Sequence, residues 1–254
     1  TQGVAYGTVL QEQRKLLHER TAQAIEMLFH SKLDDHCSEL AHHYSRCGNT
    51  AKAIEYLQRA GQQAVQRSAN AEAVNHLNAA LELLKTLPDV PERTQQEITL
   101  QLILGVPLTA TKGYGAPEMG QVYARALELC RQVGNPPQLF PALHGLWEFF
   151  LLRAELQTAR ELGEQMFSLA HRGQNPALLL EARQALGATL FQCGEFVPAQ
   201  EHLEQGIALY DPQQHGSHAF LYYGLDSGVA CRSRVALVVW ILGYPEQALK
   251  RSRE

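Results

Sequence analysis

The sequence has 254 residues, 45% of them hydrophobic, which is enough for one large or two ordinary soluble domains with a buried core. Lysine and arginine total 22 against 26 aspartate and glutamate, so no overall positive field is present and we expect no nucleic-acid partner. The longest wholly apolar run, VALVVWIL at 235–242, is far shorter than the roughly 20 residues that span a bilayer, so no membrane span is expected.

Helical periodicity recurs along the whole chain, and no segment shows the pattern of a strand. Turn signals separate the helices at LPDVPE (87–92), KGYGAP (112–117), GNPP (134–137) and GQNP (173–176). The predicted helices cover residues 8–29, 35–47, 50–67, 70–86, 93–111, 117–133, 138–152, 155–172, 176–193, 196–210, 227–242 and 245–253. A longer interruption at 211–226 predicts a loop inserted into an otherwise regular stack.

Residues 45–60, SRCGNTAKAIEYLQRA, have a near-copy at 191–206, FQCGEFVPAQEHLEQG. In both, an alanine (Ala53, Ala199) follows the glycine by five residues, a leucine by nine and a small residue by twelve. Because glycine permits the positive φ that ends a helix, each copy predicts a helical hairpin. The spacing of the small residues predicts that they lie where the two helices of a hairpin approach closely.

Two weaker copies extend the repeat. In LGYPEQAL, Gly243 precedes Ala248 by the same five residues, and in RAELQTARELGEQM Ala154 takes the place of the glycine before Ala159. The equivalent alanines Ala159, Ala199 and Ala248 are 40 and 49 residues apart. A period of this order, with two helices in each unit, predicts a solenoid of stacked hairpins.

One hairpin carries a resemblance to a known repeat. The order of small residue, tyrosine, glycine, alanine, leucine and alanine resembles the tetratricopeptide repeat (TPR), a helix–turn–helix unit of about 34 residues. It is found at Ala41, Tyr44, Gly48, Ala53, Leu57 and Ala60. The later units are longer than that repeat and resemble its irregular variants. The resemblance implies an all-α fold, a right-handed superhelical solenoid of antiparallel helix hairpins.

The two ends of the chain carry a more specific resemblance, in AYGTVLQEQRKLLHERTAQAIE (5–26) and YDPQQHGSHAFLYYGLDSGVACRSRVALVVWILGYPEQAL (210–249). They resemble the C-terminal region of large bacterial signalling proteins, in which an adenylate or guanylate cyclase domain precedes a STAND-type signal-transduction ATPase and a helical-repeat tail. The resemblance implies that residues 1–30 form a junction helix leaving an upstream ATPase module. Residues 31–254 would then be the TPR-like domain, with the insertion at 211–226.

No motif for reaction chemistry is present. The chain contains no Gly-Lys dipeptide and therefore no phosphate-binding P-loop, and GYGAPEMG at 113–120 is interpreted as a helix connector. GLDSG at 224–228 places Ser227 one position away from the nucleophile pattern G-x-S-x-G, and a helix N-cap by Asp226 or Ser227 is the favoured interpretation. We therefore expect neither an enzymatic activity nor a cofactor in this segment.

Three functions follow from these observations. We favour a protein-interaction or sensory module that regulates a linked ATPase or cyclase. Its partner would be a protein or peptide, or the ATPase and cyclase domains of the same chain. An enzyme domain would instead need a pocket with strongly perturbed titratable groups. The arm of a transcription regulator would need a basic stripe. The candidates for that stripe are Arg232, Arg234, Arg251 and Arg253.

Histidine and cysteine supply one possible metal site. Glu39, His43 and Cys47 share a helix face, with His36 nearby, and are acceptable zinc ligands. Because Cys193 stands at the same position of another repeat as Cys47, we favour packing for both and expect no metal. The five cysteines are scattered without a C-x-x-C pair, which favours a reducing, cytoplasmic location.

The repeat also predicts a binding surface. In TPR-like stacks the first helix of each hairpin lines the concave side, and counting back three, six and ten residues from the turn selects its exposed inner positions. The selected residues are His42 and Ser45; His144, Glu148 and Leu151; Gln184, Ala188 and Phe191; and Ser233, Leu237 and Trp240. Phe191 and Trp240 would anchor an extended peptide or a helix in this groove. The alternative is that both aromatic rings seal the joint between neighbouring hairpins.

Overall fold

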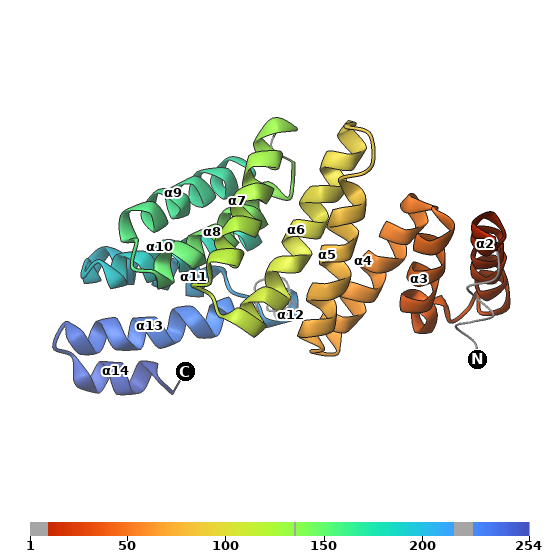
Figure 1. The fold of residues 1–254 in the computed structure, drawn as a ribbon. Helices are drawn as coiled ribbons and strands as arrows, with labels where there is room; N and C mark the ends of the chain where they lie inside the picture. Colours follow the sequence, from red (N-terminus) through yellow and green to blue (C-terminus); the bar gives the residue numbers. More distant parts are fainter. Residues whose placement is uncertain (1–9, 135, 216–225, 254) are drawn as a thin grey trace. The chain divides into compact units, whose positions relative to one another are not determined.

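The computed structural model describes residues 10–134, 136–215 and 226–253, and all regular secondary structure in these ranges is helical (Figure 1). The helices are α2 (Gln11–Leu28), α3 (Cys37–Cys47), α4 (Thr50–Gln66), α5 (Asn70–Leu84), α6 (Pro91–Lys112), α7 (Pro117–Gln132), α8 (Leu139–Leu152), α9 (Leu156–Arg172), α10 (Pro176–Gln192), α11 (Phe196–Leu209), α12 (Pro212–His215), α13 (Ser227–Ile241) and α14 (Pro245–Arg251), with a 3-10 turn, η1, at Leu33–His36. None of the described helices is both long and apolar enough to cross a membrane.

Every helix expected from the sequence is present, with ends within three residues of the prediction. Residues 8 and 9 of the first expected helix lie outside the described residues. The first turn of the expected helix at 35–47 is instead the 3-10 turn η1. α6 begins two residues earlier than predicted, at Pro91, because proline suits the first position of a helix, where its missing N–H costs nothing. Within the predicted insertion the structure adds the short helix α12, and residues 216–225 lie outside the described residues.

The described residues form two compact units that meet in sequence at Gly113 and Tyr114. In the N-terminal unit α2, α3, α4, α5 and α6 pack in succession, and in the C-terminal unit each helix from α7 to α11 packs on the next. The helix α13 then packs on both α10 and α11, and α14 packs on α13. The sequence pattern did not indicate this division. α2 packs on α3 within the N-terminal unit, and a junction role for residues 1–30 stays a prediction.

One turn geometry recurs between the helices. A residue with positive φ ends the preceding helix at Gly48, Ser68, Ala154, Gln174, Gly194 and Gly243. The N–H of the next residue then bonds to the carbonyl five residues back, as in Glu195 to Leu190 at 2.9 Å, which is the Schellman arrangement. The substitution of Ala154 for glycine is confirmed, with φ 58°. In the C-terminal unit the turns at 154, 174 and 194 are 20 residues apart, so two helices give the 40-residue period.

Small residues follow each turn where two helices approach. The alanine five residues after the turn is buried in five cases, Ala53, Ala73, Ala159, Ala199 and Ala248, as the repeat predicted for four of them. Glycine serves the same purpose within helices, because a Cβ at Gly187 would lie 2.5 Å from Leu203 Cγ. The stripe of small residues found in the sequence is therefore the helix–helix contact of each hairpin.

Candidate functional site

A small polar cavity lies in the C-terminal unit between α8, α10 and α13. Its volume is about 50 Å³. It is lined by His144, Trp147, Glu148, Leu151, Leu152, Glu181, Gln184, Ser227 and Arg234. Four of these residues were selected by the repeat register, namely His144, Glu148, Leu151 and Gln184. The register therefore brings together residues from two different hairpins, as expected if the first helices share one face.

The helices α8, α10 and α13 are the first helices of successive hairpins, and α10 contacts both of the others. His144, Glu148 and Leu151 lie on one face of α8 because they are spaced by four and three residues. The expected exposure of the inner positions is wrong for Ala188, which is 1% exposed and does not line the cavity. It is also wrong for His144, Leu151 and Gln184, which are 4%, 7% and 2% exposed. Neighbouring first helices pack directly on one another, so these side chains lie at the bottom of the cavity.

The two carboxyl groups of the cavity are strongly perturbed. Burial raises the pKa of Glu148 to about 8, and the positive charge of Arg234 offsets this only in part. The Oε2 atom of Glu148 is buried and has no hydrogen-bond partner among the described residues. Burial likewise raises the pKa of Glu181 to about 7, although the Ser227 hydroxyl, 2.7 Å from both carboxylate oxygens, donates to it. Both groups are therefore poorly compensated as carboxylates.

The other titratable groups of the cavity, His144 and Arg234, differ in their protonation. Burial lowers the pKa of His144 to about 3, so its imidazole is neutral. Burial also lowers the pKa of Arg234, which forms no ion pair with any described carboxylate. Beside the cavity, Trp147 Nε1 donates to Thr189 Oγ1 at 2.9 Å, which fixes the indole and one wall. The cavity therefore holds two acidic groups, one cation and a neutral histidine.

A larger, open pocket of about 720 Å³ lies between α13 and α14. Three residues of the predicted groove, Ser233, Leu237 and Trp240, line it. Trp240 is 62% exposed and Leu237 is 49% exposed, so an apolar surface faces solvent here. Arg232 and Arg251 line it as well.

Phe191 occupies the repeat position equivalent to Trp240, three residues before a turn glycine, but its surroundings differ. It is half-buried against the core cluster that includes Leu190, Leu203 and Val238. It also packs edge to face on Phe196, with ring centroids 5.8 Å apart. Phe191 therefore has the environment of a joint between hairpins, whereas Trp240 has the exposure expected of a groove anchor.

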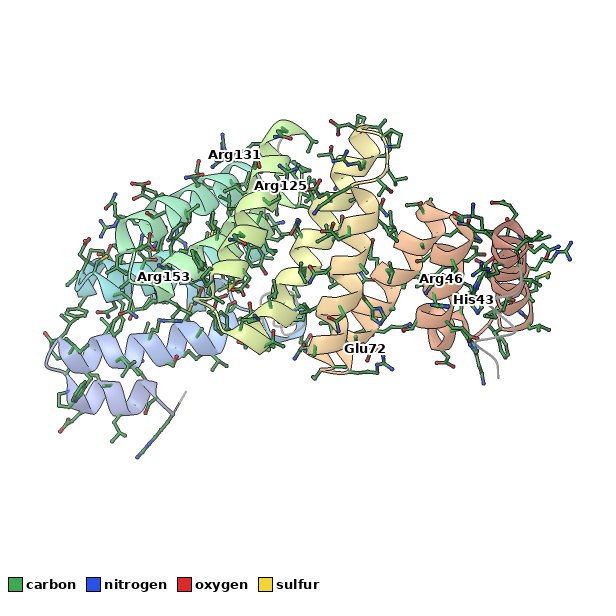
Figure 2. The ribbon with its side chains drawn as sticks, viewed as in Figure 1. His43, Arg46, Glu72, Arg125, Arg131 and Arg153 are labelled. Atoms are coloured by element: carbon green, nitrogen blue, oxygen red, sulfur yellow. The ribbon has the colours of Figure 1, made fainter. Side chains whose placement is uncertain are left out.

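The N-terminal unit has its own pocket, of about 510 Å³, on α3, α4 and α5. The predicted residues His42 and Ser45 line it, together with Arg46. Nearby, His43 on α3 faces α2, where its Nδ1 lies 2.8 Å from Nδ1 of His18 (Figure 2). Burial is the main cause that lowers the pKa of both His18 and His43.

The possible zinc ligands are engaged locally. His36 Nδ1 lies 3.2 Å from Glu39 Oε2, and the Cys47 thiol donates to the Tyr44 carbonyl. Among the described residues no group of three or more histidine, cysteine or acidic side chains is arranged to hold a metal ion. Cys47 and Cys193 are half-buried free thiols at the ends of their helices.

The remaining motifs also find structural explanations. Asp226 caps α13 by accepting the N–H of Val229 at 2.9 Å, which confirms the N-cap interpretation of GLDSG. The candidate arginines are divided between two sites. Arg234 enters the polar cavity, whereas Arg232, which lies over the Tyr210 ring, and Arg251, which donates to Glu204, both line the open pocket. Residue 224 of that motif lies outside the described residues, as does the rest of 216–225.

Sequence reasoning missed Glu181 and Arg234 as members of the cavity. Glu181 precedes Gln184 by one helical turn in LLLEARQALGATLF, where it is the one acidic residue among mainly apolar and small residues. A lone carboxylate in such a helix is a signal for a buried polar site. For Arg234 the sequence indicates only a possible place in a basic stripe.

No known family model matches this sequence. An uncharacterised protein of Rhizobium meliloti (strain 1021), R02095, is 25% identical over 244 residues, which cover 95% of this chain. The chain spans 23% of the length of that relative.

Several solved structures are similar in fold. The apo form of RapI has a TM-score of 0.64 at 14% identity, covering 79% of this chain and 68% of RapI. NprR in complex with its cognate peptide NprX has a TM-score of 0.58 at 13% identity, covering 98% and 68%. The TPR-like repeats of a kinesin light chain from Podosopora anserina have a TM-score of 0.59 at 19% identity, covering 79% and 93%. The chain therefore has a TPR-like, all-α helical-repeat fold.

Proposed function

We propose that this chain is a non-enzymatic module that binds a peptide or protein segment along the first helices of its hairpins. The observation that carries the proposal is the lining of the C-terminal unit's two pockets. Residues chosen only by their distance from the turn line both the polar cavity and the open pocket beside Trp240. A surface that combines an exposed aromatic anchor with recessed polar groups suits an extended peptide. NprR, which shares the fold, holds its cognate peptide NprX, and this supports the same use here.

The enzyme alternative required a pocket with perturbed titratable groups, and the cavity meets that requirement in part. Its volume of about 50 Å³ admits a single small polar group rather than a substrate. Its hydroxyl, on Ser227, donates to the Glu181 carboxylate, and both groups are buried, so a substrate-sized molecule has no access to the hydroxyl. These features favour binding over catalysis.

We further infer that binding regulates a signal-transduction ATPase or nucleotide cyclase in a longer protein. The sequence resemblance at residues 5–26 and 210–249 supports this inference. The relative from Rhizobium is much longer than this chain, which is compatible with additional domains. In such a protein, a bound peptide would act by changing the arrangement of the hairpins that contact the linked domain.

The proposal is tested by selecting peptides from a random display library on the immobilised chain and measuring their affinity by calorimetry. We expect Trp240→Ala to weaken the selected peptides by about tenfold or more, since aromatic anchors dominate such interfaces. A matched control is Val197→Ala, which removes an exposed apolar side chain from α11, the second helix of its hairpin. Failure to select any peptide, or equal losses in both variants, would reject the groove.

A further inference from the structure

The polar cavity between α8, α10 and α13 is rich in hydrogen-bond acceptors. Glu148 and Glu181 supply four carboxylate oxygens, and Gln184 and Ser227 add an amide and a hydroxyl oxygen. One of these acceptors, Glu148 Oε2, is buried without a partner among the described residues. A buried acceptor without a donor is costly, so a ligand that donates hydrogen bonds would be stabilised here.

The charges of the cavity also favour a cation. When both carboxylates are ionised, they outnumber the single positive charge of Arg234, because His144 is neutral. Among the described residues Arg234 forms no ion pair with either carboxylate, and its charge only partly offsets the raised pKa of Glu148. One added positive charge would balance the site.

The cavity is small. About 50 Å³ corresponds to one or two water molecules, which is the size of a single ammonium group. An ammonium has three hydrogen-bond donors and no acceptor, which suits a site rich in acceptors. A planar guanidinium is wider than this cavity favours, and a ligand carboxylate would be repelled by the two acidic groups. The apolar wall of Trp147, Leu151 and Leu152 suits the methylene groups that precede an ammonium.

We propose that this cavity binds a primary ammonium group of the peptide ligand, either a lysine side chain or a free amino terminus, with Glu148 and Glu181 as its acceptors. This inference rests on the proposed function and specifies the ligand's chemistry. Because burial raises the pKa of Glu148, the ammonium displaces a proton when it binds at neutral pH. The groups that face Glu148 are Arg234 from α13, Glu181 from α10, His144 on α8 itself and Tyr114 before α7.

The test uses four small probes, of which three carry one charge each and the Nε-acetyl derivative is neutral. They are the methylamide of N-acetyl-lysine, its Nε-acetyl derivative, glycine methylamide with a free amine, and N-acetylglycine with a free carboxylate. Binding is read from the ¹³C resonance of the Glu148 side-chain carboxyl in the full chain, assigned with Glu148→Gln. The matched control is Glu164→Gln, which changes an exposed glutamate on α9.

We expect the lysine probe to shift the Glu148 resonance and to lower the pKa of Glu148, and the Nε-acetyl derivative to do neither. Glu148→Gln should weaken the lysine probe by about tenfold or more, because a buried ammonium would lose a charged acceptor. Glu164→Gln should have no effect. Binding of the lysine probe should also tighten as the pH rises from 5 through about 8. Over this range Glu148 becomes charged, whereas the lysine ammonium, with a usual pKa of about 10.4, stays charged. Stronger binding of glycine methylamide than of the lysine probe would assign the site to an amino terminus.

Binding of N-acetylglycine in place of both amines, or no shift of the Glu148 resonance with either amine, would overturn the proposal. The wild-type resonance distinguishes these outcomes by itself, so a variant that fails to fold does not obscure them. If display peptides bind but the amines do not, the peptide groove stands and the ammonium site falls. If the amines bind but no peptide is selected, the cavity stands and the groove along α13 falls.

Discussion

The two aromatic residues at the same repeat position, Phe191 and Trp240, should respond in opposite ways to replacement by alanine. Each lies three residues before a turn glycine, Gly194 or Gly243. Phe191 packs into the core beside α13, whereas 62% of the Trp240 surface is exposed. Phe191→Ala therefore removes a packing contact between hairpins, whereas Trp240→Ala removes an exposed anchor residue.

The expected magnitudes follow from burial. Replacing a fully buried phenylalanine by alanine costs about 3–5 kcal/mol, so the half-buried Phe191 should lose somewhat less, about 2–4 kcal/mol of unfolding free energy. Trp240→Ala leaves no enclosed cavity, and its smaller buried area corresponds to about 1 kcal/mol. The peptide affinity should show the reverse order, because only Trp240 lines the open pocket.

The assay is equilibrium urea unfolding of the full chain, followed by tryptophan fluorescence. The sequence has two tryptophans, and both lie in the C-terminal unit. Trp147 is 2% exposed and hydrogen-bonded, so its emission reports unfolding of that unit even when Trp240 is absent. Equal stability losses in the two variants, or a larger loss for Trp240→Ala, would refute the assignment of Phe191 to the joint and Trp240 to the groove.

Two further predictions concern packing and protonation. Gly187→Ala should lower the unfolding free energy by about 1–3 kcal/mol, because its Cβ would lie 2.5 Å from Leu203 Cγ. The control in the same thermal melts is Gly115→Ala, whose Cβ would have its nearest contact at an ordinary 3.7 Å. Equal melting temperatures of the two variants would contradict the close contact at Gly187. The pKa values of His18 and His43 are lower in the folded chain than the usual 6.5. As the pH falls below 6.5, these histidines therefore bind protons more readily in the unfolded chain than in the folded one, and the N-terminal unit should lose stability. Urea midpoints measured by circular dichroism across this range would test it, and a midpoint that rises on acidification would contradict the direction.

The fold was predictable from the sequence because its determinants are local. Helical periodicity and the glycines at 48, 194 and 243 place nearly every helix and three of the turns. The turns at Ser68 and Gln174 were also located, because the predicted helices break there, but their positive φ was not predicted, since it is uncommon for residues other than glycine. The division at Gly113 was missed because no single residue type marks a change in packing between helices.

The candidate site was predictable in its positions but not in its environment. The repeat register found His144, Glu148 and Gln184 because one helix face recurs in each hairpin. Their depth could not be predicted, since it depends on how three helices from different hairpins close over them. Glu181 and Arg234 were missed for the same reason, because the cavity that joins them exists only after α8, α10 and α13 have packed.

The 20-residue spacing of the turns constrains how such a chain can change in length during evolution. The first helices of successive hairpins, α8, α10 and α13, pack on one another to form one layer. Gaining or losing one helix with its turn would therefore place second helices in that layer for everything that follows. The inner positions of later hairpins would then face outward, and the groove would be interrupted. Duplication of a whole hairpin, about 40 residues, keeps every later residue in its layer. An insertion between hairpins, as at 211–226, changes the length of the chain and also preserves the register. Viable relatives should therefore differ in length by whole hairpins or by insertions at the turns.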